Sequence, residues 1–169
     1  DKHVTGVQTC ALPICPIRGK VVTYVGDGAC NVPVSWVHAA AALDFEFRIA
    51  APAEFQPSAE TLAKAGGNIS CTEDIRAAVK GADMVYTDVW VSMGMEAEAE
   101  ERLAKLAGYQ INGGLMCLAK PDALVMHCLP AYRGKEIDAE TFEAHADTIF
   151  TQAENRLHTQ KAILAWLAG

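Results

Sequence analysis

Six short runs of apolar or β-branched residues alternate with segments that favour helices. The runs that predict strands lie at 21–25, 45–50, 69–71, 83–87, 123–126 and 148–150, and the helical segments lie at 34–43, 58–65, 72–79, 96–107, 138–145 and 154–167. Continuous apolar runs are typical of strands that are buried on both faces. Strands separated by helices pair in parallel through right-handed crossovers. The sequence therefore predicts an α/β fold, a doubly wound, Rossmann-like parallel sheet flanked by helices on both faces.

The size and charge of the chain limit what it can bind. It has 169 residues, which is enough for one domain with a sizeable core. Its 21 acidic and 14 basic side chains give a formal net charge of -7. Nucleic-acid binding calls for a basic patch, so this balance argues against a nucleic-acid partner. No apolar run approaches the roughly 18 residues that cross a bilayer, so we expect no membrane partner.

Six cysteines are dispersed along the chain and include no Cys-x-x-Cys pair. This spacing does not suit a zinc ribbon, and we predict no metal site. A disulfide framework is typical of small secreted domains that cannot build a sufficient apolar core. We therefore expect reduced, mostly buried thiols and a cytoplasmic location.

Residues 1–15 fit nothing that follows them. They lack the basic start and the apolar length of a secretory signal. The stretch Val4–Ile14 resembles the translated reading frame of a common DNA-sequencing adapter. We therefore expect 1–15 to be a non-native or disordered segment, and 16–169 to form the α/β domain.

Polar and reactive side chains follow three of the predicted strands. Asn31 comes after the first strand and a Gly-Asp-Gly turn, and Asp88 and Ser92 come after the fourth. His127 and Cys128 come directly after the fifth. Ligands bind outside the carboxyl ends of parallel strands, which all lie at one edge of the sheet. We therefore expect these side chains to converge on a single site.

These residue types suit an amino acid that reacts through an amine. Asp88 can accept hydrogen bonds from an ammonium group, while Asn31 and Ser92 can bond a carboxylate. A thiol beside a carboxylate, here Cys128, can orient an amine and take its proton. Simpler interpretations stay open for each segment alone. Cys128 also suits a small buried hydrophobe, and the turn before Asn31 also suits an ordinary strand-to-helix connection.

Taken together, the motifs resemble those of one enzyme family. They are Asp88-x-x-x-Ser92-Met93-Gly94, His127-Cys128-Leu129-Pro130 and Glu154-Asn155-Arg156, with Asn31 in the first glycine turn. From about Lys20 onward the chain resembles the ornithine-binding domain of the ornithine carbamoyltransferases. The resemblance implies transfer of a carbamoyl group from carbamoyl phosphate to the side-chain amine of L-ornithine. The products would be L-citrulline and phosphate, and no cofactor is implied.

The resemblance also implies a role for each matching residue. Four residues would hold ornithine: Asn31, Asp88, Ser92 and Met93. Cys128, beside Asp88, would position the attacking amine and help to deprotonate it, and its thiolate character would matter. The carbonyl group of Leu129 and the planar guanidinium of Arg156 would approach carbamoyl phosphate, as would Cys128.

The family's carbamoyl-phosphate domain has no counterpart in the sequence, which lacks its Ser-x-Arg-Thr and His-Pro-x-Gln segments. We expect the chain alone to be inactive and the parent enzyme to be a homotrimer. Three alternatives are a carbamoyltransferase for another amine, such as putrescine or acylated ornithine, an NAD-binding Rossmann domain, and a non-enzymatic ligand-binding domain. The Ser92-Met93-Gly94 triplet speaks against the first. Asn31 in place of a third glycine, and a second strand without a closing acid, speak against the NAD-binding domain.

Overall fold

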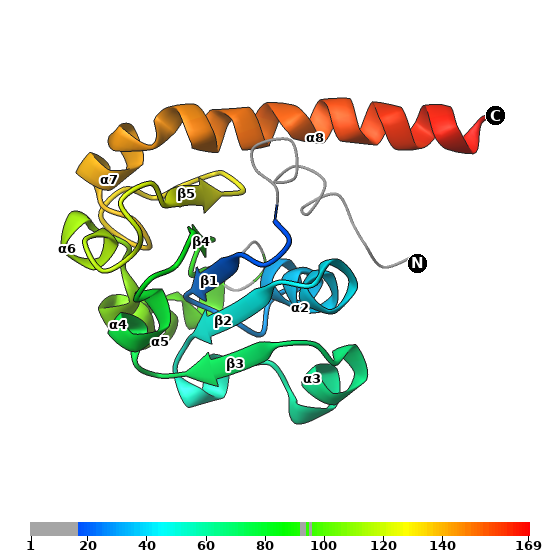
Figure 1. Cartoon of the computed structure of the whole chain (residues 1–169). Helices are drawn as coiled ribbons and strands as arrows, with labels where there is room; N and C mark the ends of the chain where they lie inside the picture. Colours follow the sequence, from blue (N-terminus) through cyan, green and yellow to red (C-terminus); the bar gives the residue numbers. More distant parts are fainter. Residues whose placement is uncertain (1–16, 92–93, 95) are drawn as a thin grey trace.

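The computed structural model describes residues 17–91, 94 and 96–169, which contain a five-stranded parallel sheet (Figure 1). The strands are β1 (Val21–Val25), β2 (Glu46–Ala50), β3 (Ile69–Thr72), β4 (Met84–Thr87) and β5 (Leu124–His127). Their order across the sheet is β3-β2-β1-β4-β5. The chain therefore reverses its direction of travel between β1 and β4, which creates a topological switch point there. The predicted non-native segment 1–15 lies outside the described residues.

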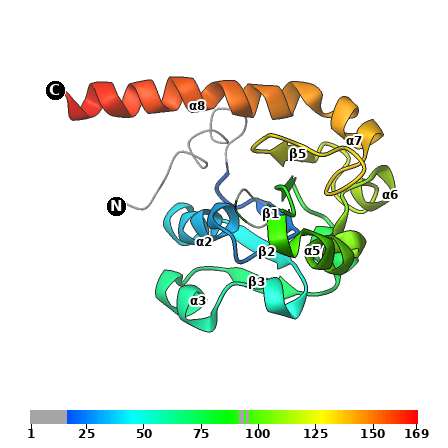
Figure 2. The same ribbon diagram turned by 180° about the vertical axis from the view of Figure 1, so that it is seen from behind.

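Helices connect the strands and cover the sheet. They are α2 (Asn31–Leu43), α3 (Ala59–Ala65), α4 (Ile75–Val79), α5 (Ala99–Leu106), α6 (Gly113–Met116), α7 (Ala139–Ala144) and α8 (Ala146–Leu167), with the short 3-10 helices η1 (Ala53–Phe55), η2 (Glu96–Glu98) and η3 (Ala107–Tyr109). Both views show α8 lying along the β5 side of the sheet and extending past it (Figures 1 and 2). Of the helices in the described ranges, none combines the length and the apolar character needed to span a bilayer.

Apolar side chains fill both faces of the sheet. On one face, Trp36 of α2 packs edge-on against the rings of Phe45 and Tyr86. On the other face, Val79 of α4 and Leu115 of α6 belong to a second apolar cluster. Because both faces are covered, the three strands β1, β4 and β5 are buried at almost every position. This arrangement confirms the predicted doubly wound sheet with helices on both faces.

The turn after β1 brings the backbone close to β2 at Gly28. A Cβ atom at this position would lie 2.5 Å from Cγ2 of Ile49 and 3.0 Å from the carbonyl oxygen of Phe55. Ile49 is fully buried, and the Phe55 atom belongs to the backbone, so neither can move away easily. Glycine at this position therefore lets the turn pack against the end of β2.

We expect Gly28→Ala to lower the free energy of unfolding by about 2 kcal/mol, because overpacking forces the backbone to shift. Gly108→Ala is the matched control, since a Cβ atom there meets nothing within 4 Å. Urea denaturation followed by circular dichroism measures both changes. Equal midpoints for the two variants would contradict the close approach at Gly28.

The sequence prediction was wrong for the last strand. Residues 148–150 belong to α8, and the sheet of the described residues has no strand there. Ile149 and Gln152 are buried, whereas Phe150 between them is half exposed. This spacing places Ile149 and Gln152 on the helix face that meets β5. Packing of a helix face thus overrides the β propensity of Thr-Ile-Phe.

Two predicted helices differ from the structure in detail. The N-cap of α4 is Asp74, whose carboxylate accepts hydrogen bonds from two backbone N–H groups, whereas Thr72, the first residue of the helical segment predicted at 72–79, ends β3. The helix predicted at 96–107 is divided among η2, α5 and η3. The charged residues of this segment are mostly exposed, but Arg102 is buried. The charge run is therefore not a uniformly solvated face.

Candidate active site

The carboxyl ends of β1, β4 and β5 lie side by side. In the register of the sheet, Val25 pairs with Thr87, and Thr87 pairs with His127. The Thr87 hydroxyl donates a hydrogen bond to the Val25 carbonyl oxygen at 2.7 Å, which fixes the junction of β1 and β4. Asp88 directly follows β4, and Cys128 directly follows β5. They therefore leave the sheet as neighbours at its carboxyl edge.

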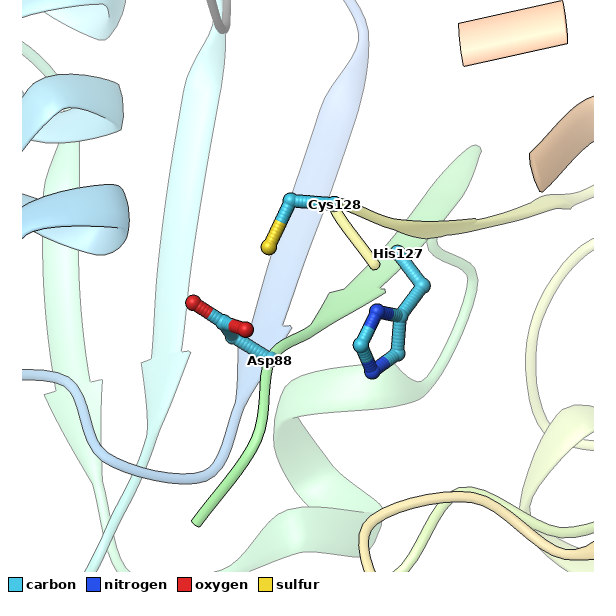
Figure 3. Close-up of side chains that lie close together, drawn as sticks. All are labelled: Asp88, His127 and Cys128. Carbon is cyan, nitrogen blue, oxygen red and sulfur yellow. The ribbon is translucent and has the colours of Figure 1, made fainter. Parts of the chain in front are cut away.

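Asp88 and Cys128 face each other at this edge (Figure 3). A carboxylate oxygen of Asp88, the sulfur of Cys128 and a ring nitrogen of His127 lie within 4.8 Å of one another. Asp88 is only 9% exposed, and its Oδ1 accepts a hydrogen bond from the Val89 backbone N–H at 2.7 Å. The carboxylate is thus held in place and retains further lone pairs for a cationic ligand.

The two cysteines at this edge are neutral thiols. Burial raises the pKa of Cys128, and the adjacent Asp88 carboxylate raises it further. This corrects the expectation of thiolate character for the free chain. Burial also raises the pKa of Cys30, at the start of α2, to about 12, and the charge of Asp88 acts in the same direction. Since Asp88 acts on both thiols, the ends of β1 and β5 both lie within electrostatic reach of this carboxylate.

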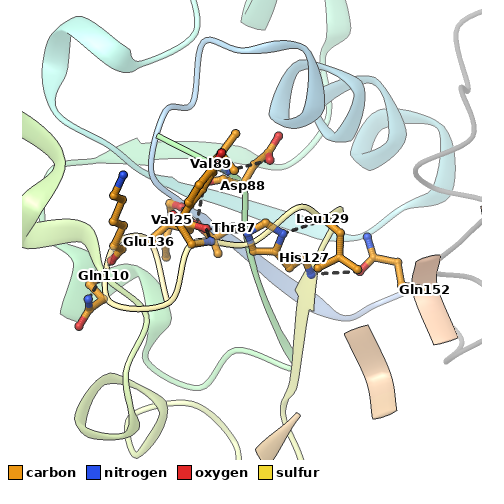
Figure 4. Close-up of polar contacts among 11 residues, drawn as sticks. Val25, Thr87, Asp88, Val89, Gln110, His127, Leu129, Glu136 and Gln152 are labelled. Atoms are coloured by element: carbon orange, nitrogen blue, oxygen red, sulfur yellow. Dashed lines mark hydrogen bonds and ion pairs between the residues drawn. The ribbon is translucent and has the colours of Figure 1, made fainter. Parts of the chain in front are cut away.

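His127 supports the site from within the core. Its Nδ1 accepts a hydrogen bond from the Leu129 backbone N–H at 2.9 Å (Figure 4), so the ring proton is on Nε2. That nitrogen donates to Oε1 of the fully buried Glu136 at 3.2 Å. Neither ring nitrogen has a lone pair to spare, so His127 cannot join its neighbours as a metal ligand in this arrangement. It instead fixes Leu129, whose φ is 56°, in the left-handed region.

Gln152 connects α8 to the site. Its Oε1 accepts a hydrogen bond from the His127 backbone N–H at 3.1 Å (Figure 4), and its Nε2 donates to the Tyr86 hydroxyl at 2.7 Å. The Tyr86 hydroxyl also interacts with the Cys128 thiol. Burial raises the pKa of Tyr86 well above its ordinary value, so this hydroxyl stays protonated. The last helix is thereby bonded to both strands that carry the acid and the thiol.

The other predicted residues lie at other positions in the chain. Asn31 is exposed at the first position of α2, directly after the turn that leaves β1. Leu129 is half-buried beside Cys128. Arg156 is exposed on α8, one helical turn beyond Gln152 and on the same side of the helix. Two further predicted residues, Ser92 and Met93, lie outside the described residues.

A comparison with protein families decides what kind of domain this is. Residues 18–167 match the Asp/Orn binding domain of the aspartate/ornithine carbamoyltransferases. The chain belongs to this family.

Several carbamoyltransferases are similar over nearly the whole chain. The ornithine carbamoyltransferase of Methylococcus capsulatus is 50% identical over 151 residues, which are 89% of this chain and 50% of the relative. That of Sulfurovum sp. is 49% identical over 162 residues, 92% of this chain and 50% of the relative. The crystal structure of anabolic ornithine carbamoyltransferase from Campylobacter jejuni has a TM-score of 0.87 at 39% identity, covering 98% of this chain and 57% of that one. The chain spans about half the length of the curated relatives it matches.

Three residues that support the site of this carbamoyltransferase domain were not predicted as site residues. They are Tyr86, Glu136 and Gln152. A helical interpretation of 146–152 would have placed Gln152 on the same face as Ile149. Tyr86 was predicted only as part of a buried strand, although a buried hydroxyl needs a partner. The residues next to Glu136 in the sequence do not indicate that it is buried, because its burial depends on how the loop after β5 returns to the core.

The effect of Asp88 on Cys128 can be measured as thiol reactivity. Since the thiolate is the nucleophile, we expect slow alkylation of Cys128 at about pH 8, with a rate that rises as pH increases. Asp88→Asn removes the anion that raises the Cys128 pKa, so alkylation should speed up by about tenfold. Iodoacetamide labelling followed by peptide mass spectrometry gives the rate at each cysteine.

Two other cysteines are internal controls for this labelling. The four cysteines of the described ranges are free thiols, and three of them are partly buried. Cys117 is exposed and should react at the same rate in both proteins. Cys71 is partly buried and reports general loosening of the fold. An unchanged Cys128 rate, or a parallel rise at Cys71, would contradict a specific effect of the Asp88 charge.

Proposed function

We propose that this domain binds L-ornithine at the carboxyl ends of β1, β4 and β5 and presents its side-chain amine to carbamoyl phosphate. The observation that carries the proposal is the Asp88 carboxylate facing the Cys128 thiol beside a topological switch point. Asp88 would accept hydrogen bonds from the side-chain ammonium group of ornithine. Asn31 and the first N–H groups of α2, whose N-cap makes no side-chain capping bond, would bind the α-carboxylate.

The chemistry that follows is carbamoyl transfer to an amine. The ammonium group of ornithine must lose a proton before its nitrogen can attack, and the Asp88 carboxylate is the nearby acceptor. Because the Cys128 thiol already carries its proton, its role in this proposal is to orient the amine through a sulfur lone pair. The nitrogen then bonds to the carbamoyl carbon, and the bond from that carbon to the phosphate oxygen breaks. Phosphate leaves with the electron pair, and the nitrogen gives its second surplus proton to the departing phosphate.

The phosphate of carbamoyl phosphate needs partners beyond these residues. In this proposal the ornithine-binding domain, residues 16–169, contributes three groups that face carbamoyl phosphate. They are Cys128, the Leu129 carbonyl and Arg156. The other contacts belong to the part of the relatives' length that the chain does not span. Apolar side chains on the second half of α8 support this division, because they are exposed and suit coverage by another domain. They are Leu157, Leu164, Trp166 and Leu167.

The setting of the parent enzyme is part of the same proposal. A homotrimeric carbamoyltransferase in the cytoplasm, acting in arginine metabolism, fits the family and the reduced cysteines. The formal net charge of -7 favours small-molecule partners over nucleic acid.

Isothermal titration of the chain with L-ornithine tests the binding step. We expect saturable binding of one L-ornithine per chain, with weaker binding of putrescine, which lacks the carboxylate, and of N-acetylornithine, whose α-amine is blocked. Titration with NADH should give no heat beyond dilution. Tighter binding of putrescine than of ornithine would reassign the substrate, and binding of NADH alone would overturn the proposal.

A second measurement concerns turnover. We expect the chain alone to form no citrulline from L-ornithine and carbamoyl phosphate, since most of the phosphate contacts lie outside it. A colorimetric citrulline assay with an ornithine carbamoyltransferase from a relative as the positive control measures this. Citrulline formed by the isolated chain would contradict the proposed division of the site.

A further inference from the structure

Arg102 is a buried cation on a helix whose other charged residues, Glu100, Glu101 and Lys105, are exposed. It lies on α5 and is 8% exposed. Its Nη2 forms an ion pair with Oδ2 of Asp27, and its Nε donates a hydrogen bond to the Trp90 carbonyl oxygen at 2.9 Å. Its Cζ lies 4.8 Å from the centre of the Phe55 ring. One side chain therefore contacts the segments that follow β1, β2 and β4.

Asp27 fixes the turn that leads to Asn31. Its Oδ1 accepts a hydrogen bond from the Ala29 backbone N–H at 3.0 Å. Its carbonyl oxygen accepts a hydrogen bond from the Cys30 thiol at 3.1 Å. These bonds shape the turn between β1 and α2, and the ion pair with Arg102 anchors the turn from outside.

Trp90 belongs to the segment that follows Asp88. Its side chain is 5% exposed and lies against the same turn, since a Cβ atom on Gly26 would be 3.6 Å from Nε1 of the indole. The two segments are therefore joined twice, by the indole against Gly26 and by the guanidinium that bridges Asp27 to the Trp90 carbonyl. The bridge requires arginine, because one planar group reaches two acceptors, whereas a lysine ammonium is a single point.

We propose that Arg102 and Asp27 are positioning residues that set the spacing between Asn31 and Asp88 for L-ornithine. This inference rests on the proposed function. A buried ion pair adds little stability compared with apolar packing of the same volume, so stability alone does not account for this pair. The pair lies between the turn that leads to Asn31 and the segment that follows Asp88, so it can hold these two segments at a fixed spacing.

Arg102→Lys tests the pair, with Arg48→Lys as the matched control. Arg48 forms an ion pair with Glu46 and donates to the carbonyl oxygens of Ala78 and Lys80 from β2, outside the candidate site. Both variants lose an arginine bridge and should melt at a lower temperature. Two readouts separate them: the dissociation constant for L-ornithine by titration, and amide hydrogen exchange over 27–31 and 88–91.

We expect Arg102→Lys to weaken ornithine binding by about tenfold or more, because small displacements of binding groups are costly. It should also speed exchange in both segments, whereas Arg48→Lys should change neither readout. Wild-type affinity and wild-type exchange in a folded Arg102→Lys protein would overturn the proposal.

Two further outcomes keep the test decisive. If the wild-type chain binds no ornithine, the proposed function fails, and hydrogen exchange alone decides whether Arg102 holds the two segments. Faster amide exchange in both segments would support the positioning role of Arg102 and Asp27, and unchanged exchange would refute it. If circular dichroism shows that Arg102→Lys does not fold, Asp27→Asn is measured in the same way. That variant keeps the shape of the side chain and removes its charge.

Discussion

Replacing Glu136 by alanine is expected to lower the free energy of unfolding by about 3–5 kcal/mol. Glu136 is fully buried, and its Oε1 accepts hydrogen bonds from Nε2 of His127 and from the backbone N–H of Tyr132. Truncation leaves the buried His127 ring N–H without an acceptor, removes the acceptor of the part-buried Tyr132 N–H, and creates a cavity beside them. Urea denaturation followed by circular dichroism measures the loss.

Two variants complete this comparison. Glu136→Gln keeps an oxygen acceptor in the same place and should cost only about 1 kcal/mol. Glu143→Ala removes an exposed carboxylate that pairs with Arg133, and should change stability by less than about 1 kcal/mol. If Glu136→Ala and Glu143→Ala unfolded at the same urea concentration, Glu136 would not organise the loop after β5.

Asp88→Asn is expected to weaken L-ornithine binding by about 3 kcal/mol, roughly 150-fold. Asparagine preserves the shape of the side chain but cannot neutralise an ammonium group, and it leaves the ligand charge unpaired in a largely buried site. Titration calorimetry on the folded variant gives the affinity directly.

Asp83→Asn is the matched control for this substitution. Asp83 precedes β4, whereas Asp88 follows it, so the two acids stand at opposite ends of the same strand. Asp83 bonds Lys20 and Lys120 and accepts from the Val21 backbone N–H, so its loss should lower stability. Ornithine affinity should not change. Equal weakening by both variants would show that Asp88 acts through the fold rather than through the ligand.

The acid and the thiol of the site could be predicted because strand ends carry positional information. A buried strand is recognised from a continuous apolar run, and parallel pairing then places residues such as Asp88 and Cys128 at one edge. The supporting residues could not be predicted in the same way. Glu136 and Gln152 reach the site through the path of a loop and the rotation of a helix, and neither follows from local residue patterns.

Charge and β propensity gave misleading signals at two places. Residues 148–150 favour a strand intrinsically, but the burial of Ile149 against β5 needs a helical face. Arg102 lies in a charged run, and such a run is typical of a solvated helix face. It shares its face with the buried Leu106 four residues later, and that spacing is the signal that could have located it.

Asp88 and Cys128 are far apart in the chain and meet only through the pairing of β4 with β5, while Asn31 follows β1, the other neighbour of β4. Such non-local parallel pairing forms slowly, and in a partly folded chain these side chains are not yet together. Ligand occupancy is therefore linked to the all-or-none folding equilibrium. A ligand at a hundredfold excess over its dissociation constant would add about 2.7 kcal/mol to the stability of the entire domain. Thermal-shift screening would consequently detect small molecules that bind at the carboxyl edge of the sheet.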